Sequence, residues 1–267
     1  MARKIILDVD TGIDDALAIA YALGSEELEL IGVTGTYGNV LVPTGTRNAL
    51  AILELFGRED VPVYAGPGHA RAKDSFEVLE ISEFIHGKNG IGEAQIPDAK
   101  REVEAKSAVD FMVESVREYG DELVIVPVGP LTTVAAAMEA NPEFAANAHI
   151  VNMGGALTVP GNVSAWAEAN INQDPEAADM VFRGVGDITM IGLDVTLQTL
   201  LTTEETAKWE ALGTTGGDFL AAATNYYIKA YETTAPYLGG CGLHDPLAVG
   251  VAVDPTLVTT IDINMKT

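Results

Sequence analysis

Short runs of apolar, β-branched residues alternate along the chain with longer segments of helical periodicity. Apolar runs of about four to eight residues are typical of buried strands, and apolar positions three and four residues apart are typical of amphipathic helices. The pattern predicts strands over residues 4–9, 28–34, 61–64, 122–128, 149–153 and 187–193, with a last candidate over 257–263. It predicts helices over residues 14–23, 44–56, 107–119, 131–140, 174–183, 204–212, 217–231 and 246–253.

Strands that alternate with helices of this length indicate a mostly parallel central sheet with helices on both faces. The chain of 267 residues contains no repeat, low-complexity tract or linker that would divide it. We therefore predict one α/β domain over residues 1–267.

Polar and glycine-rich segments follow several of the predicted strands. Two aspartates end the first strand, GTYGN follows the second, VGPLTT follows the fourth, and NMGGAL follows the fifth. Parallel α/β sheets bind ligands outside the carboxyl ends of their strands. The sequence therefore predicts a functional site at that edge.

The charge balance is strongly acidic, with 39 Asp and Glu against 15 Lys and Arg. This balance argues against binding to nucleic acid or to an anionic membrane, which both require clustered basic residues. It fits either an enzyme with carboxylates in a metal site or a host with a salty cytoplasm. No apolar stretch reaches membrane-spanning length, no secretory signal is found, and the single cysteine, Cys241, favours the cytoplasm.

Four aspartates lie within the segment DVDTGIDD, at positions 8, 10, 14 and 15. Alternate side chains of a strand share a face, so Asp8 and Asp10 are expected to point the same way. A helix N-terminus stabilises a carboxylate by only about 0.3–1 kcal/mol, which does not offset four crowded anions. A hard divalent cation such as Ca²⁺ or Mg²⁺ would. In the alternative, Asp14 only caps the helix and the other carboxylates are solvated.

Two other acidic motifs fit poorly. An EF-hand loop that began at Asp8 would need Gly and Glu where Ile13 and Ile19 stand. A phosphatase of the haloacid dehalogenase type would show Asp-x-Asp-x-Thr, but Gly12 occupies the threonine position. The phosphatase remains an alternative.

The segment DVDTGIDDA resembles the N-terminal signature of the nucleoside hydrolases, which cleave the N-glycosidic bond of ribonucleosides. Further segments resemble that family in order: YGNV with Asn39, FIHGKNGIG with His86, VPVGPLTTVA, NMGGAL, GNVSAWAEAN and GLHDPLAV. The resemblance extends from residue 4 to about residue 260. It implies the nucleoside hydrolase fold.

The resemblance implies a catalytic Ca²⁺ held by Asp10, Asp15, Asp245 and the backbone carbonyl of Val128. A water and the ribose 2′- and 3′-hydroxyls would complete about six to eight oxygen ligands. Asp8 is expected to lie outside this shell and to orient the ligands.

The resemblance also implies a mechanism. Asp10 would take a proton from the attacking water, and the net-negative site would stabilise an oxocarbenium-like transition state. His244 would protonate the leaving base or, in the alternative, only shape the wall of the site. The residues expected to bind the sugar hydroxyls are Asp14, Asn39, Asn162, Glu168 and Asn170.

The residues expected near the nucleobase each have two alternative roles. His86 either contacts the base or supports its loop, and Met153 either packs on the ribose or belongs to the core. His69 and His149 match no motif and are predicted to be structural. Three tyrosines on the late helix either stack on or protonate the base, or fill the core: Tyr226, Tyr227 and Tyr231.

The chain departs from the family pattern in three places. Thr133 replaces the asparagine that usually follows Gly-Pro-Leu-Thr, which weakens one polar contact, and Ala169 replaces an aromatic residue of the base pocket. The chain ends at Thr267, so the C-terminal strand and helix of the family are expected to be shortened.

The sequence thus predicts a cytoplasmic Ca²⁺-dependent ribonucleoside hydrolase, active as a homo-oligomer (dimer or tetramer). One alternative is a non-catalytic module that binds ribosides through the same cation. The other is the Mg²⁺-dependent phosphatase.

Overall fold

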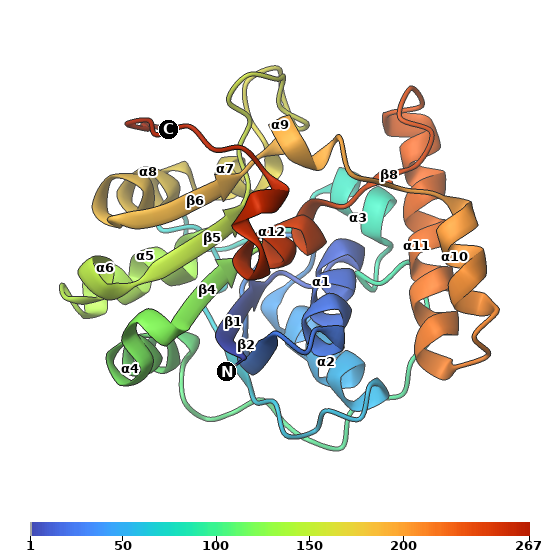
Figure 1. Cartoon of the computed structure of the whole chain (residues 1–267), viewed down its shortest axis with the longest axis horizontal. Coiled ribbons are helices and arrows are strands. Elements are labelled where there is room, and N and C mark those ends of the chain that lie inside the picture. Colours follow the sequence, from blue (N-terminus) through green and yellow to red (C-terminus); the bar gives the residue numbers. More distant parts are fainter. Residues whose placement is uncertain (1) are drawn as a thin grey trace.

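Six parallel strands form the central sheet of the computed structural model, which describes residues 2–267 (Figure 1). The order across the sheet is β3-β2-β1-β4-β5-β6. The bounds are β1 (Arg3–Val9), β2 (Leu28–Gly35), β3 (Val63–Ala65), β4 (Leu123–Pro127), β5 (His149–Met153) and β6 (Asp187–Ile191).

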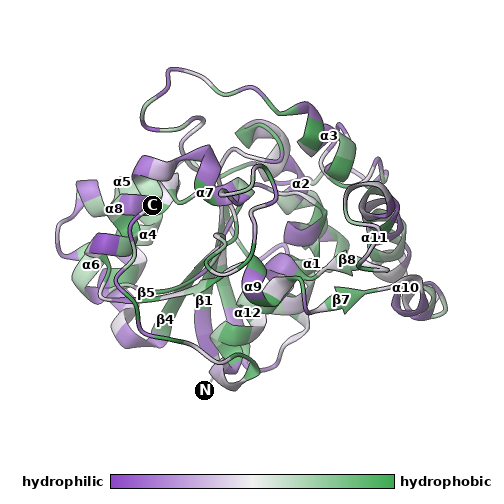
Figure 2. Ribbon diagram, turned by 90° about the horizontal axis from the view of Figure 1, so that it is seen from above, coloured by the Kyte–Doolittle hydropathy of each residue, from purple (hydrophilic) through white to green (hydrophobic). Residues whose placement is uncertain are grey.

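Helices cover both faces of this sheet (Figure 2). One face packs against α1 (Ile13–Gly24), α2 (Val42–Leu55) and α12 (His244–Val253), and α11 (Thr215–Thr234) packs against α1 farther from the sheet. The other packs against α4 (Ala108–Tyr119), α5 (Thr132–Ala140), α6 (Phe144–Asn147) and α8 (Pro175–Gly184).

Strand β1 shows why the apolar runs are continuous rather than alternating. Ile5 and Leu7 belong to the core beneath α1 and α12, whereas Ile6 between them belongs to the core beneath α4 and α5. A strand that is buried on both faces needs apolar side chains at every position. The predicted α/β fold is confirmed.

The strand order reverses between β1 and β4. From β1 the chain moves outward to β2 and β3, then returns to the other side of β1 and continues through β4, β5 and β6. The loops that leave β1 and β4 therefore diverge and open a crevice at the carboxyl edge of the sheet. This topology brings the acidic segment after β1 next to the loop after β4.

The predicted strand over residues 257–263 is wrong. The chain forms a 3-10 turn, η2 (Pro255–Leu257), and then continues without regular structure. Ile261 and Ile263 are exposed. Strand propensity is weak without a neighbouring strand and a buried face, and this segment has neither.

The structure also contains short elements that the periodicity did not predict. These are η1 (Gly120–Glu122), α3 (Glu80–His86), α6, α7 (Ala169–Gln173), α9 (Leu193–Thr196), β7 (Leu200–Leu201) and β8 (Cys241–Gly242). Apart from α3, each spans at most five residues, which is too short for a periodic signal to emerge.

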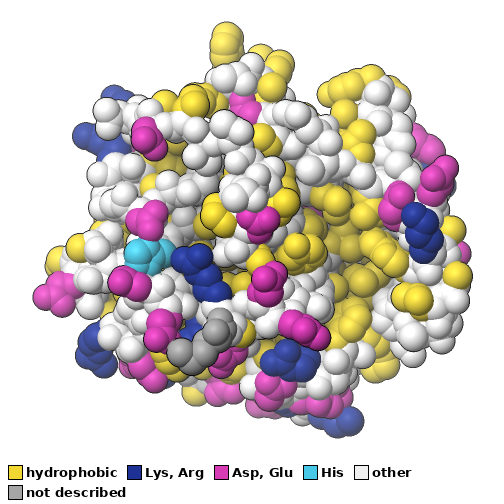
Figure 3. All heavy atoms as spheres, viewed as in Figure 1, with side chains coloured by type: hydrophobic (Ala, Val, Ile, Leu, Met, Phe, Trp, Pro, Cys, Tyr) yellow, Lys and Arg dark blue, Asp and Glu magenta, His cyan; other side chains and the backbone are white. Residues whose placement is uncertain are grey.

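An apolar groove lies between the body of the domain and the pair formed by α11 and α10 (Thr203–Glu210) (Figure 3). Its lining includes Leu17, Tyr21, Trp209, Leu220, Leu247 and Leu257.

Within residues 2–267, no helix has both the length and the apolar character needed to cross a bilayer.

Candidate active site

A cavity of about 540 Å³ opens at the carboxyl edge of the sheet, where the strand order reverses. Its walls come from the loop after β1, α3, the loop before α7, α11 and the start of α12. It brings together nearly all of the predicted site residues, namely Asp10, Asp14, Asn39, His86, Val128, Met153, Asn162, Glu168, Asn170, Tyr227, Tyr231, His244 and Asp245.

Asp8 and Asp10 do not share a face as predicted. Strand β1 ends at Val9, so the alternation of the strand does not extend to Asp10. Asp8 is fully buried and accepts a hydrogen bond from Thr34 Oγ1 at 2.6 Å, whereas Asp10 lines the cavity. Burial raises the pKa of Asp8 to about 7.

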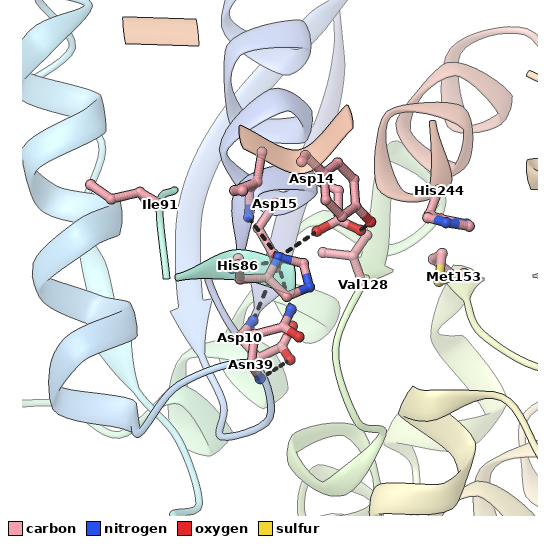
Figure 4. Close-up of polar contacts among 12 residues, drawn as sticks. Asp10, Asp14, Asp15, Asn39, His86, Ile91, Val128, Met153 and His244 are labelled. Carbon is pink, nitrogen blue, oxygen red and sulfur yellow. Dashed lines mark hydrogen bonds and ion pairs between the residues drawn. The ribbon is translucent and has the colours of Figure 1, made fainter. Parts of the chain in front are cut away.

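Asp15 organises the turn between β1 and α1. Its carboxylate accepts hydrogen bonds from the backbone N–H groups of Asp10 (3.0 Å) and Gly12 (2.7 Å). Asp10 Oδ2 in turn accepts the backbone N–H of Asn39 at 2.6 Å, and Asp10 Oδ1 has no partner among the described residues (Figure 4). The turn therefore holds Asp10 by one oxygen and leaves the other free.

A cluster of buried carboxylates lies at one end of the cavity. Asp14, Asp15 and Asp245 each place an oxygen within 4.8 Å of the others, beside Asp10. Burial, reinforced by the neighbouring aspartates, raises the pKa of Asp15 to about 7 and the pKa values of Asp10 and Asp245 well above their usual range. No Lys or Arg of the described chain lines the cavity.

The cluster fits a hard divalent cation. Asp10 Oδ1 and Asp14 Oδ1 are buried without a hydrogen-bond partner among residues 2–267, and buried carboxylate oxygens of this kind are suitable ligands for Ca²⁺ or Mg²⁺. The carbonyl of Val128 already accepts the Asn170 side-chain N–H at 2.8 Å. A carbonyl oxygen has a second lone pair, so this contact leaves room for another partner.

The predicted sugar-binding residues are held in place by their own loop. Glu168 caps α7 and accepts three backbone N–H groups, from Gly155, Asn170 and Ile171. Asn162 Oδ1 accepts the backbone N–H of Ala169 at 2.9 Å. These contacts hold the polar groups in position at the cavity wall before any ligand binds.

His244 and Met153 also line the cavity (Figure 4). The imidazole of His244 is buried, which lowers its pKa. It is hydrogen-bonded at Nε2 to Tyr231 Oη (2.6 Å) and at Nδ1 to Thr196 Oγ1 (2.8 Å). One turn away on α11, Tyr227 donates its hydroxyl to Asp14 Oδ2 at 3.2 Å.

His86 lies against the turn after β1. Its Nδ1 accepts the backbone N–H of Ile13 at 3.1 Å, so the neutral ring carries its proton on Nε2. Burial lowers its pKa. His69 and His149 lie outside the cavity lining, and His149 pairs with Asp187 and Asp121.

Sequence reasoning missed two parts of the site. Helix α3 contributes apolar lining that includes Ile81 and Ile85. The spacing of Ile81, Phe84 and Ile85 is helical and could have revealed the helix. Thr196 offered no local signal, because its partner His244 is distant in the sequence.

The sequence profile of the family described as inosine-uridine preferring nucleoside hydrolase matches residues 5–267. The chain belongs to this family. This confirms the resemblance inferred from the sequence motifs and shows that the protein is an enzyme of the nucleoside hydrolase class.

Several nucleoside hydrolases are similar to the chain over most of its length. It is 65% identical to a purine-preferring ribonucleoside hydrolase from Gardnerella vaginalis of known structure, with a TM-score of 0.98 over 99% of this chain and 84% of that one. It is 41% identical to probable uridine nucleosidase 2 from Arabidopsis thaliana, over 96% of this chain and 79% of that protein. It is 35% identical to the pyrimidine-specific ribonucleoside hydrolase RihA from Escherichia fergusonii, over 98% and 83%.

The close packing around Gly12 allows a first prediction for this nucleoside hydrolase. A Cβ atom at Gly12 would lie 2.6 Å from both Asn39 Nδ2 and His86 Nδ1, so Gly12→Ala must displace both side chains. We expect it to lower kcat/KM by about tenfold to a hundredfold, because displacing site groups by about 1 Å costs that much. Ribose release measures the effect.

Gly24→Ala is the matched control, because it lies at the end of the same helix and its Cβ would meet no atom within 4 Å. Its activity should equal that of the parent. Equal activity of the two variants would show that the contacts around Gly12 do not matter.

Proposed function

We propose that this nucleoside hydrolase uses a bound Ca²⁺ to hydrolyse ribonucleosides, purine nucleosides in preference, to free base and ribose. The observation that carries the proposal is that one cavity contains both a buried carboxylate cluster and a histidine that is hydrogen-bonded at both ring nitrogens. Nucleoside hydrolysis needs both, since charge develops on the sugar while the base departs.

The proposed ligands of the cation are Asp10, Asp15, Asp245 and the carbonyl oxygen of Val128. The unpartnered Asp10 Oδ1, the raised pKa values and the absence of basic side chains from the described lining support this assignment. When bound, the cation supplies positive charge that lowers the pKa of water and attracts the ribose hydroxyls. Asp14 lies in the same carboxylate cluster and also has an unpartnered oxygen; we assign it to the sugar on the family resemblance.

Asp10 acts on the attacking water. Asp10 lines the cavity, its Oδ1 has no hydrogen-bond partner among the described residues, and the contact of its Oδ2 with the Asn39 backbone fixes the direction of the carboxylate. Asp10 accepts a proton as the water oxygen bonds to C1′. The surrounding carboxylates stabilise the positive charge that develops on the ribose ring more than they stabilise the neutral nucleoside, as catalysis requires.

His244 and Tyr231 act on the leaving base. The electron pair of the C1′–N bond moves onto the base, which takes up a proton from the hydrogen-bonded pair of His244 and Tyr231. The proton that water loses to Asp10 balances the one that the base gains. Hydrolysis therefore leaves the net protonation of the site unchanged.

The preference for purines rests on two observations. The nucleoside hydrolase that is 65% identical to this chain is described as purine-preferring. Ala169 lines the cavity where the resemblance implied an aromatic residue, and this small side chain leaves room for a two-ring base.

A panel of ribonucleosides, assayed for ribose release, tests the proposal. We expect kcat/KM for inosine, adenosine or guanosine to exceed that for uridine and cytidine. The reverse order would overturn the preference, and tight binding without turnover would favour the non-catalytic alternative. The family match over residues 5–267 removes support for the phosphatase alternative.

The assembly and the location are proposed from the sequence. We propose a homo-oligomer, a dimer or a tetramer, in the cytoplasm. The unpaired Cys241 fits a reducing compartment. The mass in solution from light scattering tests the assembly.

A further inference from the structure

Three contacts fix the orientation of the His244 ring. Thr196 Oγ1 lies 2.8 Å from Nδ1, and Tyr231 Oη lies 2.6 Å from Nε2. A Cβ atom at Gly242 would lie 2.8 Å from Nε2, so the absence of a side chain there lets the ring lie against the backbone. His244 as a whole is only 4% exposed.

Thr196 reaches His244 from a separate part of the fold. It ends the short helix α9 after strand β6 and is fully buried. Thr199 O, in the turn that follows, accepts the backbone N–H of Leu243, which precedes His244. The backbone contact and the Thr196 hydroxyl together hold the start of α12 against the end of α9.

We propose that Thr196 is a positioning residue for His244 and that its hydroxyl promotes the departure of the base. The inference rests on the proposed function. A ring held at both nitrogens has one orientation about its Cβ–Cγ bond, with Nε2 toward Tyr231 and the cavity. Without the Thr196 hydroxyl, the ring loses one of two directional contacts and can rotate Nε2 away from Tyr231.

Thr196 can orient His244 without contributing to binding of the sugar, because of where it lies. Among the described residues, its hydroxyl has one hydrogen-bond partner, His244, and it does not line the cavity. The sugar-side groups Asn39 and Asp10 are held by other contacts. Removing the hydroxyl should therefore affect only substrates whose leaving group needs a proton.

The test compares Thr196→Val with Thr196→Ser on two ribosides that carry different leaving groups. Inosine releases a base that needs a proton, whereas p-nitrophenyl riboside releases a phenolate that is stable as an anion. We expect Thr196→Val to lower kcat for inosine by about tenfold to a hundredfold, with little change in KM, because misorienting the ring removes only part of the roughly hundredfold to ten-thousandfold that general acid–base catalysis contributes. Turnover of p-nitrophenyl riboside should stay within about threefold of the parent, and Thr196→Ser should restore inosine turnover.

Equal losses on both ribosides, or no loss on inosine, would overturn the inference. Failure of Thr196→Ser to recover activity would also contradict it, because serine retains the hydroxyl. The thermal unfolding midpoint shows whether Thr196→Val is folded. If Thr196→Val does not fold, Thr196→Ser provides the test, and the inference then requires that Thr196→Ser keep parental turnover of both ribosides. Lack of inosine turnover by the parent protein would instead remove the proposed function, and this inference with it.

Discussion

Replacing Asp10 with asparagine is expected to lower kcat for nucleoside hydrolysis by about a thousandfold or more. Asparagine keeps the shape of the side chain and an oxygen that can accept the Asn39 backbone N–H. It lacks the charge that, in the proposed mechanism, accepts the proton of water and stabilises an oxocarbenium-like transition state. General base catalysis contributes about two to four powers of ten, and loss of one electrostatically stabilising group costs about two to three. Steady-state ribose release at saturating nucleoside measures the loss.

Asp60→Asn is the matched control, because it removes the same charge from an exposed ion pair with Arg58. It should leave kcat unchanged, since exposed pairs of this kind contribute little. Turnover by Asp10→Asn close to that of the parent would refute the assigned role. The unfolding midpoint of each variant separates lost chemistry from lost structure.

Chelation of divalent cations is expected to abolish turnover, and added Ca²⁺ to restore it. Without a cation, the buried carboxylates of Asp10, Asp15 and Asp245 repel one another or take up protons, as their raised pKa values show. Ca²⁺ should therefore also raise the unfolding midpoint, because it binds the folded protein and not the unfolded chain. Calorimetric titration of the chelated protein measures binding independently of activity.

The affinity for Ca²⁺ is expected to fall as the pH is lowered. Cation binding requires ionised carboxylates, and the pKa of Asp15 is raised to about 7. The apparent affinity should therefore be highest above neutral pH and should fall as the pH drops below about 7. Asp245→Asn should lose the stabilisation by Ca²⁺ that Asp60→Asn retains. Full activity of protein shown to be free of metal would refute the cation site.

The fold was predictable to the extent that it depends on local periodicity. The run that became β1 is continuous and apolar because it is buried on both faces, and this pattern is visible in the sequence. The segment 257–263 has similar β-branched residues but no strand to pair with. Propensity alone could not distinguish the two cases, because pairing is a property of the whole sheet.

The residues of the site were predictable where they belong to motifs. Asp10 and Asn39 follow the first two strands, and the rule that parallel sheets bind ligands at their carboxyl edge was sufficient to bring them together. His244 was placed in the site only by the resemblance of GLHDPLAV to the family. The lining from α3 and the contact of Thr196 with His244 were not predicted. Both depend on which distant segments pack side by side.

The sequence by itself determined the α/β class, the acidic segment after the first strand and membership of the nucleoside hydrolases. Each is encoded in the order of residues along a short stretch, through apolar periodicity or a motif. Only the tertiary structure decided which oxygen of Asp10 stays free and which nitrogen of His244 meets Tyr231. Hydrogen bonds over a few ångströms join residues far apart in the chain, so packing of the whole domain sets their direction.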